Sequence, residues 1–326
     1  MKILVTGSSG FVGSRVIEVV KERGWESVGV VRSSSTHALN SPELFPIQAL
    51  DAKTDWQGAF DKVDCVVHCA ARVHQMQESE SDVLEAYRLV NTHGTLHLAE
   101  QAAKAGVKRF VFVSSVKVNG ERTLPEQPFT TEVLHAPDDP YGLSKYEAEL
   151  ALKALCERTN MELVTIRPPL VYGPGVKANF QSMMGWVAKG LPLPLGAIHN
   201  ARSLVYIDNL VDLILTSCVH PHASGHTFLV SDGEDVSTTQ LLKAVAKAMG
   251  KPSTLIPIPM CWIQLAAKAM GKPAVAERLC GNLQVDIEQT QSVLNWSPVV
   301  SFHEGITRTA AHFIEARNKE KNRSMS

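Results

Sequence analysis

A cluster of three glycines near the start of the chain constrains the fold more than any other feature. Residues 7–13 read GSSGFVG and directly follow the apolar run Lys2–Thr6. The next segment, Phe11–Arg23, carries valines at helical spacing and stops before a further glycine. A strand, a glycine loop and a helix in this order are typical of the first unit of a parallel α/β sheet that binds a dinucleotide.

Each position of this loop has its own expected task. Gly7 would form the tight turn, Gly10 would let the backbone approach a pyrophosphate, and Gly13 would let the helix pack closely on the strand. Phe11 and Val12 would begin the helix, whose unpaired N–H groups and partial positive charge favour an anion. A purely structural turn is the alternative, and the agreement of strand, loop and helix favours a cofactor site.

Short β-branched runs continue to alternate with helical patterns beyond this unit. The further predicted strands are Ser27–Val31, Pro46–Leu50, Cys65–Cys69, Arg109–Ser114 and Glu162–Ile166. Helices are predicted over Leu84–Ala105 and Tyr141–Arg158, the second with Asp139 as its N-cap and Pro140 at its first position. The pattern predicts an α/β fold, a Rossmann-type doubly wound parallel sheet.

The texture changes after Ile166, where proline and glycine pairs interrupt the alternation. We therefore predict a cofactor domain over 1–168 and a smaller C-terminal α/β substrate lobe over 169–326. Ser203–Ile207 and His226–Val230 still resemble strands, so part of 203–230 is expected to rejoin the first sheet. The tail 315–326 is polar and charged and is expected to fray.

Composition excludes several classes of protein. The chain has 326 residues with 32 basic and 33 acidic side chains, which argues against a nucleic-acid partner and against a small disulfide-held module. Its six cysteines form no metal-binding or paired motif, so no metal is expected. The apolar stretch Ile256–Ala267 is too short to span a bilayer, and no signal peptide is recognised. A cytoplasmic protein is expected.

The end of the second predicted strand bears on the choice of cofactor. An acidic residue there usually binds the ribose 2′-hydroxyl of NAD, whereas this chain has Arg32 followed by serines. A guanidinium suits a 2′-phosphate, so the sequence favours NADP(H) over NAD(H). A solvated cation at the strand end is the alternative.

Tyr141 and Lys145 stand at positions i and i+4 of a predicted helix and so share one face. A neighbouring cation favours a phenolate, so Lys145 is expected to lower the pKa of Tyr141 towards a useful acid–base range. Ser115 ends a predicted parallel strand at the sheet edge where ligands bind, so it could hydrogen-bond a substrate oxygen beside Tyr141.

These residues resemble the extended short-chain dehydrogenase/reductase superfamily, specifically its nucleotide-sugar epimerase/dehydratase branch. The resemblance covers nearly the whole chain because several motifs occur in order. They are the glycine loop, Asp51 after the third strand, His68-Cys69-Ala70-Ala71, Asn91-Thr92-His93-Gly94-Thr95, Ser114-Ser115, Tyr141 with Lys145, Arg167-Pro168-Pro169 and Tyr172-Gly173-Pro174-Gly175.

The resemblance implies a role for each matching residue. Ser115, Tyr141 and Lys145 would form the catalytic trio, and Lys145 would also hold the nicotinamide ribose. The remaining cofactor contacts would come from Asp51 at the adenine, Ala70 and Ala71 along the cofactor, Asn91 supporting the active-site helix, and Ala52 and Pro168. His68, His93 and His97 are interpreted as packing or surface residues.

The second lobe of such enzymes holds a nucleoside diphosphate, which makes a UDP-sugar the expected substrate. Arg202 resembles the arginine that grips the diphosphate, with Arg278 as a second candidate. Asn179 would cap the nucleotide, and Lys117 would face the sugar. The resemblance also implies a homodimer.

The motifs leave several reactions open. Val116 and Lys117 stand where dehydratases carry an acidic pair, so elimination is not expected. Because Arg32 suggests a dissociable NADP(H), the favoured reaction is reduction of a 4-keto sugar for surface polysaccharide synthesis. A UDP-sugar 4-epimerase is the main alternative. Leu170, where many relatives have asparagine, keeps an apolar steroid- or flavonoid-like substrate open. A nucleotide-sensing regulator is the alternative without catalysis.

Overall fold

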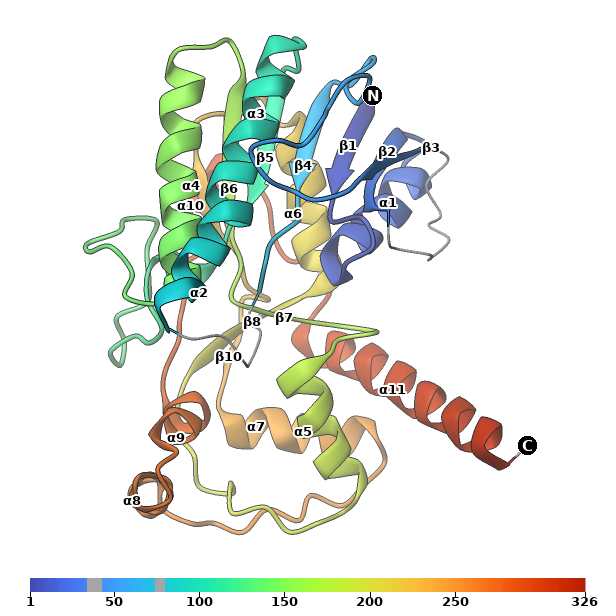
Figure 1. Cartoon of the computed structure of the whole chain (residues 1–326). Helices are drawn as coiled ribbons and strands as arrows, with labels where there is room; N and C mark the ends of the chain where they lie inside the picture. Colours follow the sequence, from blue (N-terminus) through green and yellow to red (C-terminus); the bar gives the residue numbers. More distant parts are fainter. Residues whose placement is uncertain (34–42, 74–79, 326) are drawn as a thin grey trace.

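Seven parallel strands form the sheet of the larger lobe in a computed structural model that describes residues 1–33, 43–73 and 80–325 (Figure 1). The order β3-β2-β1-β4-β5-β6-β9 confirms the predicted doubly wound sheet and places its switch point between β1 and β4. The strands are β1 (Lys2–Thr6), β2 (Glu26–Arg32), β3 (Glu43–Ile47), β4 (Cys65–His68), β5 (Arg109–Val113), β6 (Glu162–Arg167) and β9 (Thr227–Leu229).

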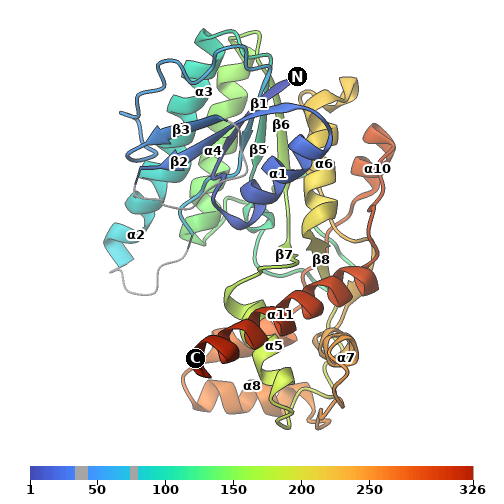
Figure 2. The same ribbon diagram turned by 90° about the vertical axis from the view of Figure 1, so that its right-hand side faces the viewer.

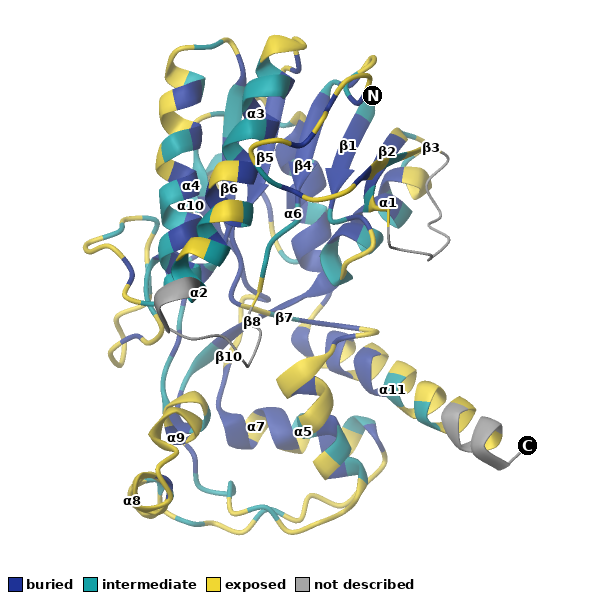
Figure 3. Cartoon of the chain, viewed as in Figure 1, coloured by how far each residue is buried: buried dark blue, intermediate teal, exposed yellow. Residues whose placement is uncertain are grey.

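Helices cover both faces of this sheet because its strands are apolar on both sides. In β1, Ile3 and Val5 pack with α1 (Phe11–Glu22) and α6 (Ile207–Val219), whereas Leu4 faces the opposite layer. That layer contains α3 (Thr95–Lys104) and α4 (Pro140–Glu157). The central strands β1, β4 and β5 are accordingly buried along almost their whole length (Figure 3).

Helix α4 begins as its sequence predicts. Asp139 is the N-cap, and its Oδ2 accepts a hydrogen bond from the backbone N–H of Gly142 at 2.8 Å. Pro140 occupies the first helical position, where its missing N–H removes no helical bond. This start fixes where the helix meets the carboxyl edge of the sheet.

The single helix predicted over Leu84–Ala105 is wrong in its middle. The chain forms α2 (Glu80–Tyr87), a π-helical segment η1 (Arg88–Gly94) and then α3. A Cβ at Gly94 would lie 2.8 Å from the carbonyl oxygen of Leu50, so the helix crosses the loop after β3 at very short range. Apolar spacing alone does not reveal such a wide turn.

The smaller lobe lies beyond the carboxyl edge of the large sheet (Figures 1 and 2). Its three-stranded sheet has the order β10-β8-β7, with β7 (Leu170–Tyr172), β8 (Arg202–Tyr206) and β10 (Asp235–Val236). Its helices are α5 (Ala178–Ala188), α7 (Thr238–Ala248), α8 (Met260–Ala269), α9 (Pro273–Cys280) and α11 (Phe302–Met325). Helix α10 (Glu288–Leu294) packs against β9 of the large sheet, and the short helical turns are η2 (Val116–Val118) and η3 (Pro221–Ala223).

Part of 203–230 rejoins the large sheet as expected, because the strand predicted at His226–Val230 pairs with β6 as β9, whereas Ser203–Ile207 pairs with β7 and β10. Two further expectations differ from the structure. The third strand lies at Glu43–Ile47, and its proline is tolerated because β3 is the sheet edge in the described part of the chain. The tail 315–325, which was expected to fray, is helical as the end of α11; residue 326 lies outside the described residues.

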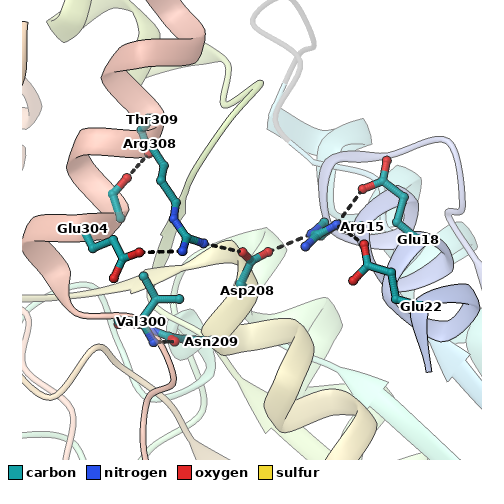
Figure 4. Close-up of polar contacts among 10 residues, drawn as sticks. Arg15, Glu18, Glu22, Asp208, Asn209, Val300, Glu304, Arg308 and Thr309 are labelled. Atoms are coloured by element: carbon teal, nitrogen blue, oxygen red, sulfur yellow. Dashed lines mark hydrogen bonds and ion pairs between the residues drawn. The ribbon is translucent and has the colours of Figure 1, made fainter.

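A chain of charged side chains joins the two lobes (Figure 4). Arg15 of α1 donates from Nε to Asp208 Oδ1 at 2.7 Å, and Arg308 of α11 approaches Asp208 Oδ2 at 3.4 Å. Glu304 pairs with Arg308 one turn earlier in α11. Helix α6 therefore ties the first helix of the sheet to the last helix of the chain. Within the described ranges, no helix combines the length and apolar character needed to cross a membrane.

Candidate active site

The glycine loop adopts the backbone that the sequence predicts. Gly7 has a φ of +64°, and a Cβ there would lie 2.9 Å from the backbone of Ala70. A Cβ at Gly13 would lie 2.2 Å from the carbonyl oxygen of Gly7, so helix α1 packs directly on the turn. Gly10 is the N-cap of α1 and supplies no side-chain cap. Because the first N–H groups of α1 remain available to an anion, the loop fits the pyrophosphate of a dinucleotide.

A buried histidine holds the two strand ends beside this loop. His68 Nδ1 lies 2.6 Å from Thr6 Oγ1, and His68 Nε2 lies 2.8 Å from Thr95 Oγ1. The N–H of Ala70 donates to the same Thr6 oxygen at 3.2 Å. Burial and the nearby charge of Lys145 hold the pKa of His68 well below its usual value, so this imidazole stays neutral. The expectation that His68 packs rather than ligates agrees with these contacts.

The residues predicted around the adenosine lie at the ends of β2 and β3. Arg32 is the last residue of β2 and is exposed. Asp51 is half-buried in a turn, where its Oδ1 accepts the N–H of Lys53 at 2.8 Å, and Ala52 beside it is exposed. Ser34, beyond Arg32, lies outside the described residues. Ala71 follows the end of β4 and is half-buried.

The structure brings the predicted catalytic trio together at the carboxyl edge of the sheet. Ser115 lies two residues after the end of β5 and shares a side-chain hydrogen bond with Tyr141. Lys145 lies one turn further along α4, 1% exposed, and donates from Nζ to the carbonyl of Val113 at 2.9 Å. Its ammonium also lies 4.4 Å from the ring centroid of Phe112.

The predicted lowering of the Tyr141 pKa is wrong for this arrangement. Burial, followed by the charge of Asp139, raises the pKa of Tyr141 to about 12, and the hydrogen bond from Ser115 offsets only part of this. Burial also lowers the pKa of Lys145 to about 8. The ammonium is directed to the Val113 carbonyl, so desolvation outweighs its attraction for a phenolate. Tyr141 is therefore a protonated hydrogen-bond donor at neutral pH.

Asn91 links the start of the catalytic helix to the loop after β4. It is fully buried, and its Oδ1 accepts the N–H of Arg72 at 2.8 Å while its Nδ2 donates to Ser144 Oγ at 3.0 Å. Ser144 Oγ in turn donates to the carbonyl of Tyr141 at 2.8 Å. This geometry agrees with a supporting role for Asn91 and with its position in the π-helical turn.

Pro168 and Lys117 also lie near the trio, with different roles. Pro168 is buried after β6, and its carbonyl accepts the N–H of Val116 at 3.0 Å. Lys117, predicted to face the sugar, has two acidic partners. Its Nζ pairs with Asp139 at 3.0 Å and with Glu121 at 3.1 Å, and these partners raise its pKa against the opposing effect of burial. Lys117 therefore supports the N-cap of α4.

The predicted diphosphate residues lie in the smaller lobe. Arg202 begins β8, and its Nη1 donates to the carbonyls of Arg278 and Gly281 at 3.2 and 3.1 Å. Burial lowers its pKa. The side chain of Arg278 is exposed on α9, and Asn179 is exposed near the start of α5. The structure brings Arg202 and the backbone of Arg278 together, and places Asn179 on a different helix, α5.

Sequence reasoning missed two buried groups beside the trio. One is the ion pair of Glu149 and Arg167, whose Oε2 and Nη2 lie 2.5 Å apart. Arg167 belongs to a motif that the sequence shows, but its partner was not predicted. Tyr87 packs its ring edge-on to Tyr141 with centroids 5.9 Å apart. Glu149 follows Lys145 by one helical turn, and a carboxylate at that spacing on an otherwise apolar face was the available signal.

A parallel sheet with a glycine loop, and with a serine, a tyrosine and a buried lysine at one edge, defines an enzyme that transfers hydride with a nicotinamide cofactor. Residues 3–231 match the family described as the NAD dependent epimerase/dehydratase family, and the chain belongs to that family. The predicted short-chain dehydrogenase/reductase enzyme is thereby confirmed. The family description supports NAD(H) and gives no support to the preference for NADP(H).

Relatives and solved structures agree with this assignment. The chain is 50% identical over 320 residues to UDP-glucose 4-epimerase of Vibrio cholerae, with 97% of both chains covered. A UDP-glucose 4-epimerase of Mycolicibacterium smegmatis is 28% identical, with 98% of this chain and 100% of the relative covered. UDP-glucuronic acid 4-epimerase of Bacillus cereus, in complex with NAD, has the same fold with a TM-score of 0.76 at 20% identity, covering 97% of this chain and 99% of that one.

Proposed function

We propose that the chain is a UDP-sugar 4-epimerase that interconverts UDP-glucose and its C4 epimer UDP-galactose. The observation that carries this proposal is the 50% identity to a UDP-glucose 4-epimerase across almost the full length of both chains. It replaces the reductase as the leading interpretation, because none of the relatives and structures described above is a 4-keto reductase.

The proposed chemistry needs one proton acceptor that becomes a proton donor in the second half of the reaction. After losing its own proton to solvent, Tyr141 as the phenolate would take the proton of the C4 hydroxyl as C4 is oxidised to a carbonyl, and would return that proton to the oxygen after the sugar has presented its other face. Bound NAD would supply a reversible hydride acceptor. Ser115 would donate a hydrogen bond to the same oxygen as its charge changes, since its hydroxyl already contacts Tyr141.

Lys145 would hold the positive charge that makes this exchange feasible. Its Nζ lies against the Val113 carbonyl, so the ammonium has a fixed position one helical turn from the phenol. Residues of the glycine loop and the N-terminus of α1 would hold the cofactor pyrophosphate, and Arg202 would face the substrate diphosphate. The other proposed cofactor contacts are Asp51, Ala52, Ala70, Ala71, Asn91 and Pro168. The substrate contacts of Arg278 and Asn179 stay predictions, as do the homodimer and the cytoplasmic location.

The test incubates the purified protein with UDP-galactose and NAD, separates UDP-glucose from UDP-galactose by chromatography, and follows NADH by its absorbance. We expect interconversion without net consumption of added NAD, and UDP-N-acetylglucosamine in parallel would define the tolerated sugar. Absence of epimers from both substrates would overturn the proposal.

A 4-keto reductase is the second candidate because Arg32 ends β2 and is exposed, which suits a 2′-phosphate and a dissociable cofactor. UDP-4-keto-6-deoxy-N-acetylglucosamine with NADPH or NADH tests it. One cofactor oxidised per sugar reduced would support this candidate, and a steroid ketone in the same assay covers the apolar alternative.

A further inference from the structure

A buried ion pair connects the middle of helix α4 to the end of strand β6. Arg167 donates from Nε and Nη2 to the two carboxylate oxygens of Glu149 at 2.9 and 2.5 Å. Arg167 is 4% exposed and Glu149 is 8% exposed. Ser114, directly after β5, donates its Oγ to Glu149 Oε1 at 2.5 Å. One carboxylate therefore joins three elements at the carboxyl edge of the sheet.

The placement of Glu149 relates this pair to the catalytic trio. Tyr141, Lys145 and Glu149 stand at successive four-residue intervals of α4 and share one face. Ser114, the second partner of Glu149, immediately precedes Ser115. The carboxylate is thus fixed to the helix that carries the phenol and to the strand end that carries the serine.

The guanidinium also reaches the loop that follows η2. Arg167 Nη1 donates to Asn119 Oδ1 at 3.1 Å and to the carbonyl of Thr131 at 2.9 Å. Thr131 Oγ1 donates to Gln289 Oε1 at 2.9 Å, which lies in α10. The pair therefore links the catalytic helix to a loop that is anchored on the C-terminal half of the chain.

Stability alone does not account for so many polar groups in this position. A buried ion pair costs desolvation and is often no more stabilising than apolar residues of the same volume. Here the guanidinium and both carboxylate oxygens are satisfied, so what the pair supplies is a defined geometry. Misplacing a catalytic group by about 1 Å can cost about a hundredfold in rate.

We propose that Glu149 and Arg167 are positioning residues, whose ion pair fixes helix α4 against β5 and β6 and so places Tyr141 and Lys145 beside Ser115. This inference rests on the proposed hydride-transfer function of the trio. Neither residue needs to touch the substrate or the cofactor for this role.

The charges around Lys145 make the proposal measurable. Burial lowers the pKa of Lys145 to about 8, and Cys69 and Glu149 oppose that effect. His68 also faces the ammonium from β4, and Arg167 faces Glu149 from β6. Glu149→Gln would remove one opposing charge and leave the guanidinium unpaired, which would lower the pKa of Lys145 further. Arg167→Gln would leave the carboxylate unpaired and would raise it.

The experiment compares Glu149→Gln, Arg167→Gln and the double variant in the full-length protein. The pKa of Lys145 is read from its side-chain Cε signal in lysine-labelled protein, assigned by the loss of that signal in Lys145→Met. We expect shifts of about one pH unit in opposite directions for the single variants and a value near wild type for the double variant. With the epimerase substrates, kcat should fall about tenfold in each single variant while NAD affinity changes less than about threefold.

A matched control lies at the other end of the same two strands. Arg109 of β5 pairs with Glu162 of β6 with Nη2 and Oε2 2.6 Å apart, far from the trio along both strands. Glu162→Gln should leave kcat and the pKa of Lys145 unchanged. Shifts in the same direction for both single variants, or an unchanged kcat, would overturn the positioning role.

Two provisions keep the result decisive. If the single variants do not fold, Glu149→Asp takes their place, because it keeps both charges and shortens the reach of the carboxylate. We expect this variant to lose about tenfold in kcat while the pKa of Lys145 stays unchanged. An unchanged kcat would contradict the proposal. The titration of Lys145 needs no substrate. If wild type fails to epimerise UDP-galactose, opposite shifts still support the coupling of the pair to Lys145, and only the proposed substrate falls.

Discussion

The two sides of the candidate active site are built differently. On the sheet side, Ser115 follows β5 and Tyr141 begins α4, so regular backbone geometry places both side chains. On the lobe side, Arg202 is fixed by carbonyl groups from a segment about 80 residues later in the chain, and Asn179 and Arg278 are exposed. The first side depends on local connections and the second on packing between distant segments. Substrate specificity is therefore the property that local sequence describes least.

The largest expected effect lies on the sheet side. Tyr141→Phe removes the only proton that the proposed mechanism moves between enzyme and substrate, so kcat should fall about a thousandfold. NAD affinity, measured by fluorescence titration, should stay within about threefold because the glycine loop is untouched. Tyr146→Phe on the same helix is the control and should keep full turnover. Retention of a tenth of the wild-type kcat by Tyr141→Phe would contradict the assigned role.

Two glycines compare the packing of the two lobes directly. Gly13→Ala would place a Cβ 2.2 Å from the Gly7 carbonyl oxygen, so we expect a loss of about 3 kcal/mol in the free energy of unfolding and weak NAD binding. Gly185→Ala in α5 meets no atom within 4 Å and should stabilise the helix by about 0.5–1 kcal/mol. Urea unfolding of both variants checks this. Equal effects would show that the two lobes are packed alike around these helices.

Substitutions at two cations separate substrate binding from helix support. Arg202→Ala should raise the KM for the UDP-sugar about tenfold with kcat within about threefold, because a diphosphate would lose its fork-shaped donor. Lys117→Ala should leave KM unchanged and lower the free energy of unfolding by up to about 1 kcal/mol, since its partners are Asp139 and Glu121. Steady-state kinetics decides, and an equal rise in KM for Lys117→Ala would restore its predicted place at the sugar.

The smallest expected effect is a dependence of stability on pH from the sheet side. The pKa of His68 is lowered in the folded state, so below about pH 6.5 only the unfolded chain binds that proton. The folded state therefore loses stability as the pH falls below about 6.5. His68→Gln should lose less over this range than wild type in urea unfolding. His303→Gln, on the exposed face of α11, should behave as wild type.

Local patterns predicted most of the sheet and the sheet side of the site. The glycine loop, the N-cap of α4 and the convergence of Ser115 with Tyr141 follow from strand ends and helix starts, which the sequence marks with glycine, aspartate and proline. The partner of β8 could not be predicted, because a strand pattern indicates burial but not which neighbour it pairs with.

Electrostatics was predicted least well. The predicted lowering of the Tyr141 pKa assumed that an ammonium on the same helix face would stabilise the phenolate. Burial instead dominates the pKa values of both Tyr141 and Lys145. Lys117 likewise had an unpredictable partner, because Glu121 and Asp139 reach it through a turn and a helix cap. Such pairings depend on the folded geometry and have no periodic signature.

The π-helical turn at Arg88–Gly94 restricts the number of residues that the chain can have between α2 and α3. A regular α-helix rotates by about 100° per residue, so one insertion or deletion here would turn α2 by that angle relative to α3. Asn91 would then leave Ser144, and Gly94 would leave the Leu50 carbonyl. Insertions and deletions in this short segment should therefore be as damaging as substitutions of its buried residues.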